Sequence, residues 1–266
     1  MTINLDIYCV TNKKLDFLEK TPLKLVGVGN ENFSNDYIKC DIKKNIYHKE
    51  KYYSELTFHY WYWKNILPNE KKKWVGFCQK RRFWIRPDKN KDAINFDNLN
   101  DFLLTKIDGK LDSYESFICK PIKISGAKKM KIIKRGWRNI IRDPLIILSK
   151  KKENLLLHFD MHHGYKNLEK AINLLDEDNK NDFFNYVKNR DFYNPHIMCI
   201  SKPEILNKWF ANLFKWLGRC ENEFGYDKLH GYDTQRLYAY LAERYLSYWF
   251  KKYTNYKELP WVLIDN

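Results

Sequence analysis

The residues best placed to do chemistry include two arginines, Arg81 and Arg82, just beyond the apolar run Trp74–Cys78. That run has the length and composition of a buried central strand. Active sites of open α/β sheets lie at the carboxyl ends of strands, and two guanidinium groups there can hold a diphosphate through paired hydrogen bonds. The alternative is an ordinary pair of salt bridges at a strand end. We favour anion binding, because the preceding strand is predicted to be central.

Two histidines, His158 and His162, stand four residues apart, so a helix would place both on one face. That spacing can hold a metal ion, but the glutamate of the His-Glu-x-x-His motif is missing, and we favour ordinary helix histidines. The chain also lacks the glycine-rich fingerprints of dinucleotide-binding and P-loop proteins, and the Gly-x-Ser-x-Gly elbow of hydrolases. These absences weaken the case for a dehydrogenase, an NTPase or an esterase.

The charge of the chain predicts a polyanionic partner. Its 266 residues carry a formal net charge of +15, while 44% hydrophobic residues exclude a disordered chain. Candidate partners are nucleic acid, an anionic membrane face and phosphorylated small molecules. Ten basic residues fall in a segment at 124–152, interleaved with Trp137 and several isoleucines at helical spacing. This insertion suits an interfacial helix on anionic lipid, although a core helix with a solvated basic face has the same pattern.

The surroundings of the protein are predicted from what the sequence lacks. Its six cysteines are scattered without a Cys-x-x-Cys pair, which argues against a zinc ribbon. Cys78, inside the apolar run, is expected to be a reduced core residue. The first residues lack the pattern of a signal peptide, and no apolar run has the length of a membrane-spanning helix. We therefore expect a cytoplasmic protein.

Hydrophobic periodicity predicts an α/β fold with strands mostly early and helices mostly late. Strands are expected at 3–9, 23–30, 72–78, 117–124 and 196–201. Helices are expected at 55–66 (capped by Ser54), 97–104, 158–175 (with a possible continuation through 183–190), 203–219 and 234–251, and a loop at 31–52. This order predicts a nucleotide-binding half at 1–123, the basic insertion at 124–152 and a helical, acceptor-side half at 153–266, which together form one continuous domain.

Five segments carry a family resemblance. They are Tyr8–Lys13, the helix motif Glu55–Asn65, the strand end Gly76–Phe83, Asn194–Met198, and Arg236–Arg244 with its Leu-Ala-Glu-Arg ending. In this order they resemble a family of bacterial capsular polysaccharide and O-antigen glycosyltransferases. The resemblance covers nearly the whole chain. The chain departs from the family at Gln79-Lys80, where His-Tyr is usual, and at Asp233-Thr234, where Tyr-Gln is common.

The resemblance implies a GT-A-like fold and sugar transfer from a nucleotide-diphosphate sugar, with a UDP-sugar favoured and galactofuranose or a hexose as the sugar. It further implies a polyprenyl-diphosphate-linked glycan as acceptor and peripheral association with the inner membrane, for which the basic insertion would supply the lipid contact. Glycosyltransferases of this fold normally hold a divalent ion in an Asp-x-Asp motif, and Gln79–Arg82 stands in its place. Because the departing diphosphate requires positive charge rather than a particular ion, Arg81 and Arg82 are expected to supply it. Metal dependence would then be reduced, with Asp160 and His162 as the remaining metal candidates.

An inverting transfer requires a base at the acceptor hydroxyl. The candidates, in order of preference, are Asp233, Asp160 and Glu243; helix capping is the alternative for Asp233, and a helix salt bridge for Glu243. The expected donor-binding residues are Thr11, Asn12, Lys14, Asp36, Glu55, Thr57, Lys64, Arg81 and Arg82. The expected acceptor-side residues are His162, His163, Asn194, His196 and Arg236, with ordinary polar capping as the alternative throughout. Two rival functions remain: a nucleic-acid-binding module without catalysis, for which charge is the only support, and a glycosyltransferase relic that acts as a scaffold.

Overall fold

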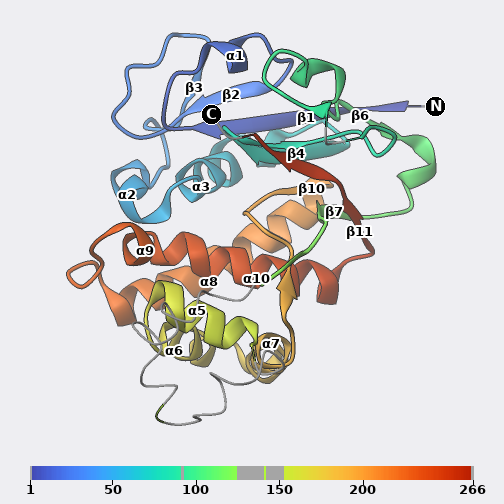
Figure 1. The fold of residues 1–266 in the computed structure, drawn as a ribbon. Coiled ribbons are helices and arrows are strands. Elements are labelled where there is room, and N and C mark those ends of the chain that lie inside the picture. The colour runs from blue at the N-terminus through green and yellow to red at the C-terminus, as the bar shows by residue number, and fades with distance from the viewer. Residues whose placement is uncertain (1, 91–92, 125–140, 142–152, 265–266) are drawn as a thin grey trace. The chain divides into compact units, whose positions relative to one another are not determined.

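The computed structural model describes residues 2–90, 93–124, 141 and 153–264 (Figure 1). These residues form two compact units. The first, called the sheet unit, comprises residues 1–120, 196–214 and 249–266; the second, called the helical unit, comprises residues 121–195 and 215–248. The units do not follow the expected boundaries at 123 and 153, because two segments from late in the chain belong to the sheet unit.

One large sheet forms the centre of the sheet unit. Along its main path the strands follow the order β11 (Tyr256–Leu259), β7 (Ser116–Cys119), β10 (Cys199–Ser201), β4 (Trp74–Gln79), β1 (Thr2–Thr11), β2 (Lys24–Gly27) and β3 (Ile38–Lys39). Strand β1 runs parallel to both β2 and β4, whereas β10 runs antiparallel to β4 and β7. Three short strands pair off this path: β5 (Arg82–Trp84), β6 (Lys106–Asp108) and β12 (Trp261–Leu263).

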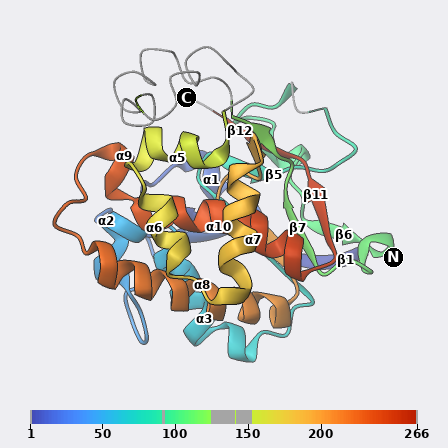
Figure 2. The same ribbon diagram turned by 90° about the horizontal axis from the view of Figure 1, so that it is seen from below.

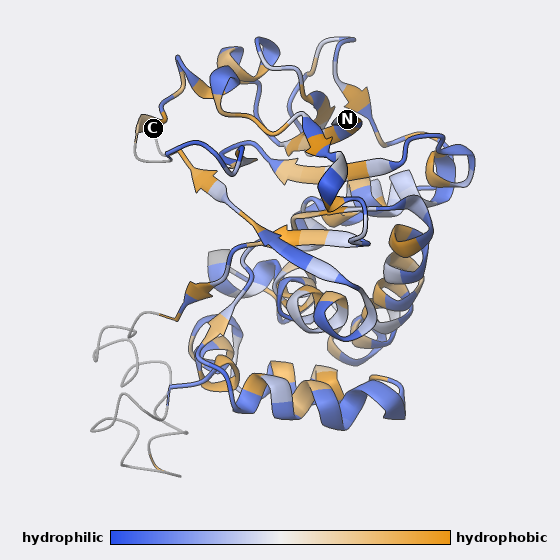
Figure 3. Ribbon diagram, turned by 90° about the vertical axis from the view of Figure 1, so that its right-hand side faces the viewer, coloured by the Kyte–Doolittle hydropathy of each residue, from blue (hydrophilic) through white to orange (hydrophobic). Residues whose placement is uncertain are grey.

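The central strands are buried on both faces, as their continuous apolar runs predict. Cys9 of β1 pairs in register with Leu25 on one side and with Cys78 on the other. Both cysteines are almost fully buried. Figure 3 shows hydrophobic residues concentrated in these strands. At Gly76 a Cβ atom would come within 2.8 Å of Ile200 Cγ1 and 3.1 Å of Ile7 Cγ1. Only glycine therefore allows the sheet to pack this closely at the centre of β4.

Helix α3 (Leu56–Asn65) packs an aromatic face against the sheet. Phe58 lies 5.4 Å from Tyr8 and 6.2 Å from Phe77 between ring centroids, and Tyr62 lies 5.1 Å from Tyr8. Such ring pairs add to the burial energy of the helix, by about 0.5–1.5 kcal/mol each. The sheet unit also contains α1 (Asp16–Glu19), α2 (Glu50–Tyr53) and the 3-10 turns η1 (Tyr47–Lys49), η2 (Leu67–Asn69), η4 (Leu99–Asp101) and η5 (Gly109–Leu111).

The helical unit contains α5 (Leu155–His163), α6 (Asn167–Asn173), α7 (Glu177–Lys188) and α9 (Tyr232–Gln235), all labelled in Figure 2. Antiparallel strands β8 (Ile122–Lys123) and β9 (Phe192–Tyr193) belong to it as well. Two long helices, α8 (Pro203–Phe224) and α10 (Leu237–Tyr253), each contribute residues to both units. Trp216 centres the core of the unit, with its Nε1 donating to the Ala171 carbonyl at 2.7 Å and its ring 4.7 Å from that of Tyr245.

Several expected elements have other boundaries. The helix expected at 97–104 is wrong, since only η4 forms there. The side-chain oxygen of Asn95 accepts hydrogen bonds from the backbone N–H groups of Asp97 and Asn98, and the Asn95 N–H in turn donates to Asn98 Oδ1. Such local bonds compete with a helix. The Ser54 cap is also wrong: Ser54 has φ +49° and makes no side-chain cap bond to α3.

The helix expected at 158–175 is interrupted, because the chain turns at Gly164 and Lys166, which have φ values of +104° and +62°. Helix α7 is separate from α6 rather than a continuation of it. Pro121 divides the strand expected at 117–124 into β7 and β8, since proline cannot donate to a strand ladder. The expected loop at 31–52 contains β3, η1 and α2. Residues of the basic insertion lie outside the described residues, apart from its first residue and Ile141.

The strands at the end of the chain are absent from the sequence-based expectation. Strand β11 joins the edge of the sheet parallel to β7, and β12 pairs with β5. All six cysteines are buried and unbridged, as expected for Cys78. Every helix among the described residues is too short or too polar to cross a lipid bilayer.

Candidate functional site

Polar side chains gather where three parallel strands of the sheet unit end. Thr11 at the end of β1 pairs with Gly27 of β2, and Val10 pairs with Gln79 of β4. The carboxyl ends of β2, β1 and β4 therefore lie side by side, which is where open α/β sheets bind their ligands. We call the residues that follow these ends, together with the first residue before α3, the strand-edge cluster: Asn12, Glu55, Gln79, Lys80, Arg81 and Arg82.

Hydrogen bonds tie this cluster together. Lys80 Nζ donates to Asn12 Oδ1 at 2.6 Å, which joins the turn after β4 to the end of β1. Gln79 stands between two charged groups, because its Nε2 donates to Glu55 Oε1 and its Oε1 accepts from Arg82 at 3.0 Å. An amide in this position fixes a carboxylate and a guanidinium at once. Gln79 and Lys80 thus supply all three of these bonds.

The two arginines occupy different positions. Gln79 and Arg82 pair across the tight turn from β4 to β5, so Arg81 lies at the turn itself, where its carbonyl accepts from the Ile264 N–H at 2.9 Å. Arg82 is half-buried, and its Nε is buried without a hydrogen-bond partner among the described residues. A buried guanidinium N–H without an acceptor costs free energy. The cluster contains three cations, Lys80, Arg81 and Arg82, and one carboxylate, Glu55.

Other expected donor residues near this edge are committed to local bonds. The hydroxyl of Thr11, 1% exposed, donates to the Lys13 carbonyl at 2.6 Å. Lys14 approaches Glu19 at 3.7 Å, and Asp36 accepts from Ser34 at 3.3 Å; both are exposed.

A residue that sequence reasoning missed is Glu50. A Cβ atom on Gly29, just beyond β2, would lie 3.6 Å from both Asn12 Cβ and the Glu50 carboxyl group. Gly29 has φ +80°, and its carbonyl accepts from the Tyr47 hydroxyl. A second carboxylate thus reaches the strand edge from α2, whose presence the polar composition of 31–52 did not predict.

Two residues of α3 expected at the donor site lie elsewhere. Thr57 is fully buried, and its hydroxyl donates to the Ser54 carbonyl at 2.8 Å. Lys64 is nine residues from Glu55, about 13 Å along a helix axis, and its Nζ lies 3.0 Å from the centroid of the Trp63 ring. Glu55 is the member of this helix motif that the structure brings to the strand edge.

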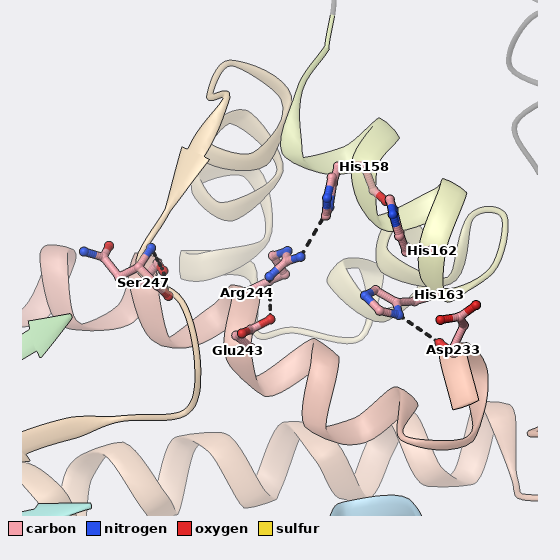
Figure 4. Close-up of polar contacts among 8 residues, drawn as sticks. His158, His162, His163, Asp233, Glu243, Arg244 and Ser247 are labelled. Carbon is pink, nitrogen blue, oxygen red and sulfur yellow. Dashed lines mark hydrogen bonds and ion pairs between the residues drawn. The ribbon is translucent and has the colours of Figure 1, made fainter. Parts of the chain in front are cut away.

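A second polar cluster lies inside the helical unit around Arg244, which is 1% exposed (Figure 4). Its NH1 donates to Glu243 Oε2 at 2.6 Å, its NH2 lies 3.4 Å from His158 Nδ1, and its guanidinium carbon lies 3.7 Å from the centroid of the Tyr193 ring. A buried cation requires such compensation. In the sequence, Arg244 belongs only to the Leu-Ala-Glu-Arg motif, and nothing in the sequence indicates that its side chain is buried.

Two histidines of α5, His158 and His163, are held neutral beside this cation. Burial, and then the positive charge of Arg244, lower the pKa of His158 to about 2 and that of His163 to about 3. Since a guanidinium can only donate, His158 Nδ1 accepts and its proton lies on Nε2. His163 Nδ1 donates to the Asp233 carbonyl at 2.8 Å. Burial by itself would lower the pKa of Arg244. The effects of Tyr193 and Glu243 outweigh that of burial, so the pKa of Arg244 is raised.

The remaining predicted residues of the helical unit are spread around this cluster. Asp160, 8% exposed, accepts from the Lys166 N–H at 3.0 Å and so stabilises the turn after α5. His162 Nδ1 donates to the His158 carbonyl at 2.9 Å. Asp233 lies in the first turn of α9, and Figure 4 shows its carboxylate turned away from Arg244. Arg236 lies half-buried at the end of α9.

Asn194 and His196 fall in different units. The backbone N–H of Asn194 donates to Ser247 Oγ at 3.0 Å within the helical unit. His196, in the sheet unit, has φ +66° and lies edge-on to Trp261 at 4.7 Å between ring centroids. As for a metal, the described part of the chain contains no group of three His, Cys, Asp or Glu side chains arranged to hold one.

Comparison with known proteins supports the fold. A family model described as a domain of unknown function (DUF4422) matches residues 6–255. A solved structure of the bifunctional glycosyltransferase WbbM in its apo form is similar, with a TM-score of 0.69 and 18% sequence identity, over 99% of this chain and 46% of that chain. This chain thus spans about half the length of that protein. No curated protein matches. The expected fold class, a glycosyltransferase-like α/β sheet followed by a mainly helical half, is confirmed.

Proposed function

From the fact that the chain belongs to the DUF4422 family, and from its fold, we propose that it is a glycosyltransferase that moves a sugar from a nucleotide-diphosphate donor to a glycan acceptor. The support from comparison is the likeness of fold to a bifunctional glycosyltransferase. The observation that carries the proposal is the strand-edge cluster, where three cations follow the central strand β4 and a buried Arg82 N–H has no acceptor among the residues that the structure describes.

The cluster suits the diphosphate of the donor. Breaking the bond between sugar and diphosphate leaves negative charge on the phosphate oxygens, and fixed cations stabilise that charge without moving during the reaction. Arg82 would bind a phosphate oxygen through Nε, while Gln79 holds its NH1 in place. Lys80, held by Asn12, adds a second cation from the same turn. Asn12 and Glu50 flank the end of the neighbouring strand, where the nucleoside would lie.

Arg81, Arg82 and Lys80 would thus do the work that a divalent ion does in related folds. Asp160 and His162, the expected alternative, are each bonded to backbone groups. The test is transfer by metal-free protein. We expect EDTA to leave turnover within about twofold of the untreated rate, and loss of turnover that Mn²⁺ restores would refute the role of the arginines.

An inverting transfer also requires a base for the acceptor hydroxyl. Asp233 is the preferred base, because one oxygen of Asp160 is already bonded to Lys166 and Glu243 is bonded to a permanent cation. Replacing Asp233 with Asn should lower turnover about 100-fold or more while nucleotide binding is retained. Unchanged turnover in this variant would remove Asp233 from the mechanism.

The finer assignment follows the family resemblance. We propose a UDP-sugar donor, with galactofuranose or a hexose, and a polyprenyl-diphosphate-linked acceptor of capsule or O-antigen synthesis at the inner membrane. Residues 124–152 would contact anionic lipid. Deleting them should weaken co-sedimentation with anionic vesicles, whereas unchanged binding would refute that role.

The deciding experiment is a thermal-shift screen with UDP, GDP, CMP and their sugars against a single-stranded oligonucleotide. We expect stabilisation by one nucleotide class at concentrations where the oligonucleotide has no effect. Stabilisation by the oligonucleotide alone would favour a nucleic-acid-binding module, the reading supported by the net charge of +15. Nucleotide binding with neither donor hydrolysis nor transfer would favour a scaffold.

A further inference from the structure

A loop of the sheet unit, residues 41–46, presents an isoleucine to solvent. Ile42 is 57% exposed and stands among Asp41, Lys43 and Lys44, which are exposed as well. An aliphatic side chain exposed to this extent gains only part of its possible burial energy within its own unit. The exposure of Ile42 therefore either has no role or serves to contact a partner.

The loop is held in one conformation. Asn45 Nδ2 donates to the carbonyls of Asp41 at 2.9 Å and Lys43 at 3.0 Å, and Lys43 adopts φ +56°. From α3, Trp61 Nε1 donates to the Ile42 carbonyl at 2.8 Å, and Asn65 Nδ2 donates to the Lys44 carbonyl at 2.8 Å. A left-handed lysine costs about 1 kcal/mol or more. This bonding keeps Ile42 and both lysines displayed at the surface rather than folded away.

An aromatic group adjoins the loop along the end of α3. Trp63 stacks on Phe214 of α8 at 5.7 Å between centroids with a 10° tilt, and Tyr60 meets Phe214 edge-on at 5.1 Å. All three rings are only partly buried. The Lys64 ammonium lies 3.0 Å from the centroid of the Trp63 ring. Because Phe214 stacks on that ring and the Lys64 ammonium lies over it, Trp63 is not open to stack on a sugar.

The charge of this surface is positive. Lys43, Lys44 and Lys64 form no ion pair with a described carboxylate, and Asp41 is the acidic residue of the loop. Burial, and then the charge of Lys44, lower the pKa of Lys64. Lys44 and Lys64 are thus close enough to repel one another, and a negatively charged partner would relieve that repulsion.

We propose that this surface, formed by Ile42, Lys43, Lys44, Tyr60, Trp63 and Lys64, docks the sheet unit on an anionic lipid bilayer. Ile42 enters the headgroup region, the partly buried Tyr60 and Trp63 lie at the level where aromatic rings collect at membrane interfaces, and the lysines meet lipid phosphates. The surface contains no residue of 124–152, and the proposal does not depend on glycosyl transfer.

A bilayer fits these residues better than a soluble polyanion does. A polyanion would be bound by the lysines alone and gains nothing from an exposed isoleucine. Lipid association combines buried apolar area with attraction to anionic headgroups, and both are present within one loop and the helix that holds it. The decisive readout is therefore whether position 42 itself enters an apolar environment.

The experiment places one fluorescent label at position 42. All six native cysteines are buried, so Ile42→Cys creates a single accessible thiol for an environment-sensitive dye. We expect a blue shift with phosphatidylcholine vesicles that contain phosphatidylglycerol and none with phosphatidylcholine alone. Leu263→Cys is the matched control, since Leu263 is 41% exposed in the same unit; its label should not shift. Because the dye reports only its own position, lipid binding through residues 124–152 does not imitate the result.

A charge variant tests the lysines. Lys43→Gln with Lys44→Gln should weaken the vesicle affinity reported at position 42 about 10- to 30-fold, from the usual contribution of each lysine near an anionic surface. The control pair Lys89→Gln with Lys106→Gln makes the same charge change at exposed sites of the sheet unit and should keep the affinity within about twofold. Nucleotide stabilisation should persist in all variants, so a failure here is distinct from a failure of the proposed function.

Three outcomes would overturn the proposal. One is vesicle binding by the labelled protein without a blue shift at position 42. Another is an equal loss of affinity in both lysine pairs, which would indicate only the general field of a basic protein. The last is binding to dextran sulfate that depends on Lys43 and Lys44 without any vesicle response, which would assign the surface to an acidic polymer.

Discussion

Replacing Arg82 with Gln removes the strand-edge guanidinium whose Nε has no acceptor in the described part of the chain. The substitution keeps a polar side chain at the start of β5 but deletes the charge and the NH1 bond to Gln79 at 3.0 Å. If Arg82 binds a phosphate oxygen, the nucleotide complex loses a charge-assisted hydrogen bond, which is usually worth about 1.5–3 kcal/mol. That range corresponds to a Kd for the stabilising nucleotide that rises roughly 10- to 150-fold.

The assay is isothermal titration of the nucleotide identified by thermal shift, at fixed ionic strength because charge pairs are screened by salt. Arg82→Lys keeps the charge without the planar fork and should fall between the wild type and Arg82→Gln. Arg86→Gln is the matched control. Arg86 is exposed and paired with Asp88 at 2.8 Å on the surface, so its loss should change Kd less than about twofold. A Kd for Arg82→Gln equal to that of the control would refute diphosphate binding at this edge.

Three further changes test the packing and electrostatics of each unit. Arg244→Met should lower the free energy of unfolding by about 3–5 kcal/mol, because it leaves Glu243, 15% exposed, without its cation; Glu243→Gln in the same chain should recover part of the loss in urea titration, and no recovery would count against the pairing. Gly76→Ala should cost about 1–3 kcal/mol, since its Cβ would meet Ile200 at 2.8 Å; the cost should shrink when Ile200 is also replaced with Ala, and an unchanged urea midpoint would contradict the close packing of β4. Burial lowers the pKa of His59 to about 3. As pH falls below about 6.5, the unfolded chain therefore binds a proton that the folded chain does not. The free energy of unfolding then decreases by about 1.4 kcal/mol per pH unit, down to the pKa of the folded state. His59→Phe should reduce that slope between pH 6 and pH 4 in urea titration, and an unaltered slope would show that His59 is not neutral in the fold.

Strong local patterns predicted the framework of the sheet unit. The alternation at 3–9 and the apolar run at 74–78 correspond to β1 and β4, and the helical periodicity at 203–219 corresponds to α8. In each case one residue period extends over several residues, so local structure and burial agree. Prediction failed where short polar side chains bond the backbone, as at Asn95 and Asn98, and where strands are too short to show a period, as in β5 and β12.

The candidate site divides in the same way. The expectation that Arg81 and Arg82 follow a central strand agrees with the structure, because strand position can be inferred from composition. The roles of Thr57 and Lys64 could not be judged from spacing, since helical spacing alone does not show that Thr57 bonds the backbone of Ser54 or that Lys64 lies over Trp63. Glu50 was missed because its helix, α2, has only four residues.

Charge, the central strands and the amphipathic helices were determined by the sequence itself, since each depends on residue types within one short window. Only the tertiary structure decided which distant groups meet: Gln79 with Glu55 across 24 residues, Arg244 with His158 across 86, and Trp63 with Asn207 across 144. The physical reason is that a hydrogen bond or an ion pair depends on the distance between two atoms in space. Packing of the sheet and the helices sets that distance, and no local pattern encodes it.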